Sequence, residues 1–181
     1  MSKVLLFSRT DVRILIIWLL IIGYLSSSIM AQTLALPSNI KTSPDLQLLL
    51  VKMLNNSETF RAQCEKIAAA PQAHIEIKIM PSIAQGSRAF SSIKRSQGQL
   101  EITIQLVPMP PNLYVELIGH EFEHILEQIE GVDLRALASK PKSKVYRLYS
   151  GSFETDRALR AGHTVAYEYE WHKHEIVAQI P

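Results

Sequence analysis

Apolar and polar positions first follow a helical pattern. The stretch PDLQLLLVKMLNN comes directly after Ser43 and begins with proline, and a serine followed by proline is typical of a helix start. A second helix is predicted over SETFRAQCEKIAAA, where Ser57 is the capping residue and Pro71 ends the segment. Two consecutive helices are therefore expected early in the chain.

The pattern then changes to strict alternation. In HIEIKIM (residues 74–80), isoleucines alternate with polar residues, which is typical of a half-buried strand. RAFSSIKR (88–95) is a weaker strand candidate. LEITIQLV (100–107) alternates clearly, and the turn SQGQ, which contains Gly98, joins these last two as a hairpin. We expect a small antiparallel sheet of about three strands.

After the segment PMPP (108–111), the helical period returns. Between Asn112 and about Glu130 the apolar positions recur at helical spacing, and Gly131 provides the stop. These apolar positions are Leu113, Leu117, Phe122, Ile125, Leu126 and Ile129. A long helix is predicted here.

The C-terminal part contains shorter signals and one long helix. VDLRALA (132–138) predicts a short turn of helix, and SKPKSKVYRLYSGS (139–152) reads as loop with one helical turn inside it. A final long helix is predicted from Phe153 to about His172. Because strands and helices occur in separate runs, the pattern predicts an α+β domain.

The first 31 residues are typical of an export signal. A basic start precedes the unbroken apolar run Ile14–Leu25, and small residues follow it before Gln32. The run has 12 residues, whereas a membrane-spanning helix needs roughly 20. We expect cleavage near Ala31 and a periplasmic or extracellular protein. If the signal is not cleaved, residues 14–25 are an N-terminal anchor and the chain's contact with the membrane.

Removal of this segment changes the charge balance. The full chain has 19 Lys/Arg and 17 Asp/Glu, and the segment holds three basic residues and one acidic residue, so 16 of each remain. The mature chain is formally neutral, which gives no reason to expect a nucleic-acid partner. Residues 32–43 are interpreted as a linker, and residues 44–181 as one domain.

The chemically informative motif is ELIGHEFEHILEQIEG, residues 116–131. Residues four apart in a helix share a face, so His120 and His124 can direct two imidazoles at one metal ion. Glu121 is rotated by about 100° from His120, which places its carboxylate beside the metal, where it can accept a proton from a metal-bound water. The alternative is a chance occurrence on a solvated helix face.

A catalytic zinc usually has three protein ligands, and Glu154 is the best third candidate. It lies near the start of the predicted last helix, where helical projection places small residues along its stripe: Ala158, Ala161 and Val165. These would let the helix approach the motif helix closely. The alternative role for Glu154 is an acid in the first helical turn that complements the helix dipole.

Other candidates are weaker. His163 points to the opposite side of the predicted helix from Glu154, and His172 and His174 lie near a solvated C-terminal end. Asp156 would face solvent or a nearby arginine. Cys64 is the sole cysteine, so no internal disulfide can form, and its helical position favours a small core residue.

GHEFEH followed by FETDRALRAG resembles the gluzincin branch of HExxH zinc metallopeptidases, and in particular small exported bacterial proteins with the same two motifs. The resemblance covers about residues 99–170. It implies a minimal zincin-like domain in which LEITIQLV is the edge strand beside the cleft. It also implies a zinc ion and these site residues: His120 and His124 as ligands, Glu154 as third ligand, and Glu121 as general base.

The chain also departs from that family. It is too short for the larger helical domain that follows the motif helix, and Ala158 stands where an aspartate normally contacts a histidine ligand. Tyr149 and Tyr146 are the candidates for stabilising the oxyanion.

The expected function is zinc-dependent hydrolysis of a peptide or amide bond, with a peptide or protein as substrate. One alternative is a non-peptide amide hydrolase, such as a deformylase-like enzyme with Cys64 as a ligand. The other is a non-catalytic metal-binding or envelope interaction protein.

Overall fold

The computed structural model describes residues 35–83 and 87–178, with side chains up to residue 172. The expected signal, residues 1–31, lies outside the described residues. Within the described part, no helix combines the length and the apolar character needed to cross a bilayer.

Both predicted N-terminal helices are confirmed, as α2 (Pro44–Asn56) and α3 (Glu58–Ala68). Ser57 caps α3, because its hydroxyl accepts a hydrogen bond from the Phe60 N–H at 3.0 Å. Ser43 occupies the N-cap position of α2, but its side chain makes no capping hydrogen bond. Proline at the first position of α2 is favourable without one.

The main sheet has four strands in the order β1-β2-β4-β3: β1 (Ile40–Thr42), β2 (Ala73–Ile79), β4 (Gln99–Leu106) and β3 (Ala89–Ser96). The β3–β4 hairpin is confirmed. The expectation of an antiparallel sheet is wrong for the other pairs, because β2 runs parallel to both β1 and β4. Alternation of apolar residues is the same in both directions, so the pattern could not distinguish them.

The interpretation of residues 32–43 as a linker is wrong for residues 40–42, which form strand β1. The Asn39 side chain holds this segment in place by donating hydrogen bonds to the carbonyl groups of Ile67, Ala70 and Ala73. Ile40 is buried and pairs with Ile75. Three residues of the expected tether therefore belong to the sheet, and the folded part begins before Pro44.

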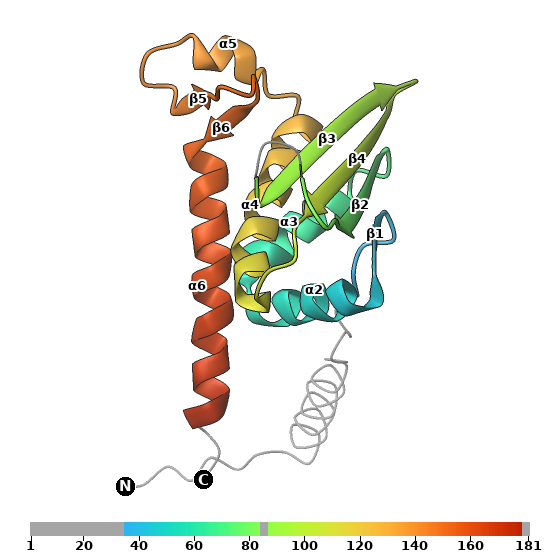
Figure 1. Cartoon of the computed structure of the whole chain (residues 1–181), viewed down its shortest axis with the longest axis vertical. Helices are drawn as coiled ribbons and strands as arrows, with labels where there is room; N and C mark the ends of the chain where they lie inside the picture. Colours follow the sequence, from blue (N-terminus) through green and yellow to red (C-terminus); the bar gives the residue numbers. More distant parts are fainter. Residues whose placement is uncertain (1–34, 84–86, 179–181) are drawn as a thin grey trace, which may run out of the picture. The chain divides into compact units, whose positions relative to one another are not determined.

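One face of the sheet forms the core with the helices. In β2 and β4 every second residue is buried, apart from Ile79 at the end of β2, and the residues between are exposed or half-buried. Figure 1 shows α2, α3 and α4 (Pro111–Ile129) beside the sheet. Phe60 of α3 and Phe122 of α4 are fully buried, with ring centroids 5.1 Å apart. Helix α4 is thereby fixed between the core and the last helix.

The last helix, α6 (Asp156–Ala178), lies directly against α4 (Figure 1). Two glycines allow this close approach. A Cβ on Gly162 would lie 2.8 Å from the Glu116 carbonyl oxygen and 3.0 Å from the His120 Cβ. A Cβ on Gly119 would lie 2.9 Å from the Val165 side chain. No larger residue fits at either position without moving the helices apart.

Between α4 and α6 the chain forms α5 (Leu134–Ala138) and a two-stranded sheet of β5 (Val145–Arg147) and β6 (Phe153–Thr155). The short helical turn predicted in VDLRALA is confirmed as α5. The predicted start of the last helix at Phe153 is wrong, because residues 153–155 are a strand. Thr155 then caps α6, since its Oγ1 accepts from the Ala158 N–H at 3.0 Å. The α+β fold class is confirmed.

Candidate metal centre

His120 and His124 lie on the face of α4 that is turned toward β6. Their ring centroids are 4.8 Å apart, and the rings meet edge to face at 80°. Each side chain keeps 16% of its surface exposed. Both imidazoles are therefore held by the fold and remain reachable from solvent.

Glu154 of β6 meets both histidines. Its Oε2 is 3.5 Å from His120 Nε2, and its Oε1 is 3.4 Å from His124 Nε2. Two ligands at 2.0–2.1 Å from a tetrahedral zinc ion would lie about 3.4 Å apart. The three residues form a cluster that could hold a metal ion, with ligand atoms within 4.8 Å of one another. Each Glu154–histidine distance is thus close to the separation of two zinc ligands, with one carboxylate oxygen near each histidine.

Glu154 reaches this place from a strand, and the predicted helical stripe is wrong. Of the predicted small-residue stripe, Ala158 and Val165 are fully buried, whereas Ala161 is half-buried. Glu154 itself is set by β-pairing, since it lies opposite Tyr146 of β5. The Thr155 N–H also donates to Glu154 Oε1 at 2.8 Å, which orients the carboxylate.

The protonation of the cluster reflects its acidic surroundings. Burial alone lowers the pKa of His124, but its hydrogen bonds with Glu127 and Glu154 outweigh burial and raise this pKa to about 9. Burial raises the pKa of Glu154, but the hydrogen bond with His124 and the charge of His120 hold it below the ordinary value. Without a metal, the cluster thus favours a positive charge on His124. A bound cation would take the place of that proton.

Glu127 is a site residue that the sequence interpretation missed. Its Oε2 lies 2.8 Å from His124 Nδ1, and its Oε1 accepts a hydrogen bond from Thr155 Oγ1 at 2.7 Å. Only 2% of Glu127 is exposed. A carboxylate on Nδ1 leaves the Nε2 of His124 for a metal and fixes the ring. The three-residue spacing of His124 and Glu127 on one helix was the available signal.

The contact also bears on Ala158, the position at which the resemblance leads one to expect an aspartate. In the resembled family an aspartate after the glutamate ligand contacts a histidine, whereas Ala158 occupies that position here and is fully buried. In this chain Glu127 supplies the carboxylate from α4 itself, so the histidine keeps its partner while α6 packs closely.

Glu121 projects toward the sheet. The Ser91 hydroxyl of β3 donates a hydrogen bond to Glu121 Oε2, and the Glu121 side chain is almost buried. The strand beside the motif helix is therefore β3. The expectation that LEITIQLV forms the edge is wrong, because it forms β4, which lies between β2 and β3. Ser91 was also missed, since nothing local in RAFSSIKR indicates the contact.

The remaining ligand candidates lie apart from the cluster. Cys64 is buried in α3, and burial, with a smaller effect of Glu65, raises its thiol pKa to about 12. His163 is mostly exposed and pairs with Glu116 at 3.1 Å. His172 is exposed, and the side chain of His174 lies outside the described part. None of them joins the cluster found among the described residues.

The acidic and tyrosine candidates near the cluster have other contacts. Asp156 is half-buried and pairs with Lys144 at 3.4 Å and with Arg160 at 3.5 Å, and the second pair agrees with the sequence interpretation. It also accepts a hydrogen bond from the Tyr146 hydroxyl at 3.2 Å. Tyr149 is fully exposed. Neither tyrosine is directed at the cluster by a contact in the structure.

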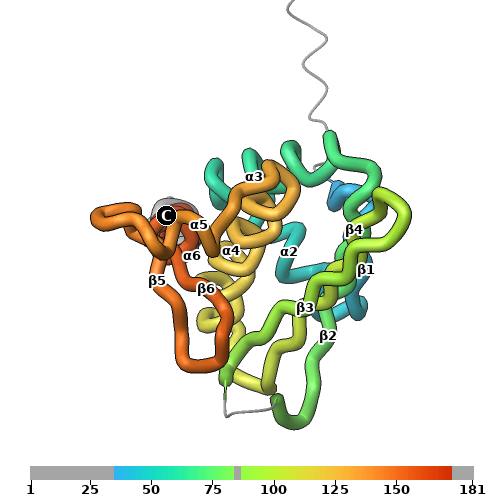
Figure 2. Tube along the Cα trace, turned by 90° about the horizontal axis from the view of Figure 1, so that it is seen from above, coloured from blue at the N-terminus to red at the C-terminus, as the bar shows by residue number. Residues whose placement is uncertain are grey.

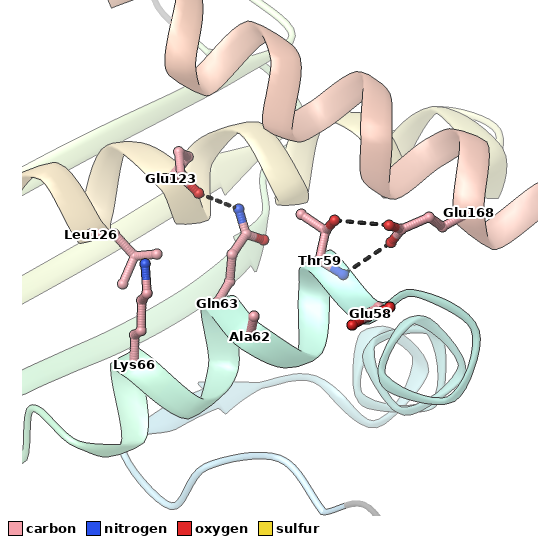
Figure 3. Close-up of a pocket in the computed structure, with 8 residues that line it drawn as sticks. All are labelled: Glu58, Thr59, Ala62, Gln63, Lys66, Glu123, Leu126 and Glu168. Atoms are coloured by element: carbon pink, nitrogen blue, oxygen red, sulfur yellow. Dashed lines mark hydrogen bonds between the residues drawn. The ribbon is translucent and has the colours of Figure 1, made fainter.

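A hollow of about 330 Å³ lies between α3, α4 and α6 (Figure 3). Gln63 donates to the Gly119 carbonyl at 2.9 Å and to Glu123 at 2.8 Å. Glu168 of α6 accepts hydrogen bonds from the Thr59 N–H and hydroxyl. No residue of the metal cluster lines this hollow, so its polar contacts serve to join the three helices.

Arg157, here named the arginine clamp, makes a further connection between α6 and α4 close to Glu154. The Nε of Arg157 donates to Glu123 at 2.6 Å, and its terminal nitrogens contact Glu130 at 2.5 and 3.0 Å. The clamp joins the first turn of α6 to α4, three residues after Glu154. It therefore helps to set the position of β6 beside the histidines.

No family model matches this chain, and no curated protein or solved structure matches it.

Proposed function

We propose that this protein is a zinc-dependent hydrolase that cleaves a peptide or amide bond. The observation that carries the proposal is the meeting of His120, His124 and Glu154, whose ligand atoms lie within 4.8 Å of one another, with Glu121 next to His120 on the same helix. The resemblance of the two motifs to gluzincin metallopeptidases supports the same conclusion.

The donor set favours zinc. Two imidazole nitrogens and one carboxylate form a typical ligand set of catalytic zinc sites, in which the fourth position is open to water. Each histidine ligand in such sites usually has a hydrogen-bonding partner on its other nitrogen, as His124 has in Glu127. When bound, zinc would lower the pKa of a water molecule and polarise the scissile carbonyl group.

The chain's own residues would perform the proton transfers. Glu121 accepts a proton from the attacking water and delivers it to the nitrogen of the leaving amine. The Ser91 hydroxyl holds one carboxylate oxygen of Glu121 and leaves the other for the water. Glu121 therefore acts as general base and then as general acid, in an orientation set from β3.

Strand β3 is suited to hold the substrate. It is an edge strand, paired with β4 on one side only in the described part of the chain. An extended peptide could add to the free edge through backbone hydrogen bonds. The Ser91–Glu121 contact brings this edge next to the catalytic carboxylate, so a peptide paired with β3 would pass the metal.

The proposed location follows from the N-terminal pattern. Residues 1–31 would direct export, which places the enzyme in the periplasm or outside the cell. If the signal is retained, residues 14–25 would anchor it there. Substrates would then be exported or extracellular peptides and proteins.

The test combines metal content with digestion of a peptide library. The full-chain protein should contain about one zinc per chain and cleave a subset of peptides. Glu121→Gln should keep its zinc and lose a factor of about 10²–10⁴ in turnover, because general acid–base catalysis contributes this much. If the zinc-loaded parent cleaves neither peptides nor simple amides, the non-catalytic metal-binding alternative holds instead. Unchanged turnover in Glu121→Gln would remove this residue from the mechanism.

A further inference from the structure

Residues 134–153, here named the basic segment, carry an unusual concentration of positive charge. They contain five cationic residues and no acidic residue: Arg135, Lys140, Lys142, Lys144 and Arg147. The whole chain is nearly balanced, with 19 basic and 17 acidic residues. Residues 134–153 thus carry a local excess of five positive charges, which produces a local positive field.

These charges are not neutralised within the described part of the protein. All five cationic side chains are exposed, and Lys144 is the only one of the five that forms an ion pair with a described residue, Asp156. The neighbouring acids are already engaged: Glu130 binds Arg157, and Asp133 caps α5 by accepting from the Ala136 N–H. The other four cations thus face solvent and can attract an external anion.

The basic segment has a defined shape. Asp133 starts α5, and β5 pairs with β6 in register. Lys142 and Lys144 adopt left-handed backbone conformations, with φ of 64° and 61°. Non-glycine residues occupy this region rarely, and such conformations persist only where the surroundings impose them. The lysines are therefore presented on a shaped loop.

The segment also borders the metal cluster. Tyr146 lies opposite Glu154 and Arg147 opposite Phe153 in the β5–β6 pair. Figure 2 shows the β5–β6 hairpin and strand β3 on opposite sides of α4, the helix that carries the two histidines. A peptide that runs from β3 across the candidate ligands would therefore reach the side of α4 on which the basic segment lies.

We propose that the basic segment binds an acidic stretch of the peptide substrate, close to the bond that is cleaved. This inference rests on the proposed function for the identity of the substrate. The cations increase the rate of encounter and select peptides with Asp or Glu on one side of the cleaved bond. Because the charges are exposed, salt weakens this selection.

A binding experiment tests this separately from catalysis. Full-chain Glu121→Gln protein is titrated with three fluorescent peptides of equal length that carry glutamates, glutamines or lysines at the same positions. At low salt the acidic peptide should bind about tenfold more tightly than the glutamine peptide, and the difference should shrink at high salt. Equal binding of all three peptides would overturn the proposal.

Matched charge reversals locate the surface. In the same background, Lys140→Glu with Lys142→Glu should abolish the preference for the acidic peptide. Lys41→Glu with Lys52→Glu changes the net charge equally at exposed positions on β1 and α2, and should leave the preference intact. If both double variants lost the preference for the acidic peptide equally, net charge alone would account for the preference and the proposal would be overturned. All four positions are exposed, so thermal melting should show that both variants fold.

An experiment with lipid vesicles distinguishes an acidic peptide from an anionic lipid surface as the partner of the basic segment. Vesicles of phosphatidylglycerol and of phosphatidylcholine are compared with the same proteins. The proposal would be overturned in favour of a membrane contact if the protein showed no preference for the acidic peptide but bound phosphatidylglycerol vesicles, and if this binding required Lys140 and Lys142. If the acidic peptide binds as predicted while the parent protein cleaves no peptide, the proposed function fails and the surface remains an acidic-peptide site.

Discussion

Glu127 joins His124 to Thr155: one carboxylate oxygen lies 2.8 Å from the imidazole Nδ1, and the other accepts the threonine hydroxyl at 2.7 Å. Thr155 is the residue after Glu154 and also caps α6. A single buried carboxylate thus connects a histidine on α4 with the strand that carries the third candidate ligand. The two parts of the cluster are therefore positioned together.

Replacing Glu127 with alanine should weaken zinc binding by about 10–100-fold, because partners of histidine ligands typically contribute this much. Zinc affinity is measured by competition with a chromophoric chelator. Glu127→Gln keeps the shape and one oxygen acceptor, so it should fall between the parent and the alanine variant. Parental affinity in Glu127→Ala would show that the contact does not position His124.

Glu154→Ala should lower zinc affinity and thermal stability together. Ligands come from α4 and β6, so metal binding also contributes to the free energy of folding. The difference in melting temperature between parent and variant should disappear when both are measured with excess chelator. Cys64→Ala, His163→Ala and His172→Ala should keep the zinc content of the parent. If Glu154→Ala binds zinc normally and one of these three does not, the assigned cluster is wrong.

Gly162→Ala should destabilise the protein by about 1–3 kcal/mol, although alanine is the better helix former by about 1 kcal/mol. The new methyl group would overlap the Glu116 carbonyl oxygen and the His120 Cβ, so α4 and α6 must move apart. Because His120 itself is displaced, zinc affinity should fall as well. Thr164→Ala, at an exposed position two residues away, is the control and should leave stability and affinity nearly unchanged. A Gly162→Ala protein as stable as the parent would mean that the helices tolerate the separation.

Glu168 should make the stability depend on pH. Burial raises the pKa of its carboxyl group, but hydrogen bonds from Ser57 and Thr59 lower it below the ordinary value of 4.5. A depressed folded-state pKa contributes stability above the unfolded pKa, and this contribution is lost as the pH falls through the folded pKa. Glu168→Gln should therefore cost about 1 kcal/mol at neutral pH, a small value because solvent screens the partly exposed carboxylate.

Chemical denaturation at several pH values measures this contribution. The difference between the parent and Glu168→Gln should be constant from pH 7 to about pH 5 and should narrow below pH 4.5. Glu65→Gln, at an exposed position of α3, is the control and should show no such dependence. A difference that widens toward acid would reverse the assigned sign.

The helices and the β3–β4 hairpin could be predicted from the sequence because they depend on neighbouring residues. A 3.6-residue period defines one face of α4, so His120 and His124 had to share that face and Glu121 had to lie beside it. A turn at Gly98 between two alternating stretches similarly predicts a hairpin. Small residues at Ala158 and Val165 indicated that the last helix packs closely, and both are fully buried.

Tertiary structure decided the remaining features, because contacts distant in sequence compete with local preferences. Residues 153–155 could start a helix, but β5 provides strand partners and Thr155 caps α6. β1 forms because Asn39 binds carbonyl groups about 30 residues further along the chain. Alternation does not determine the direction or the order of the strands. Strand β3 lies at the edge of the sheet because β2 pairs with the other side of β4. The sequence by itself determined the two histidines and the glutamate of one helix, whereas long-range pairing brought Glu154, Glu127 and Ser91 to them.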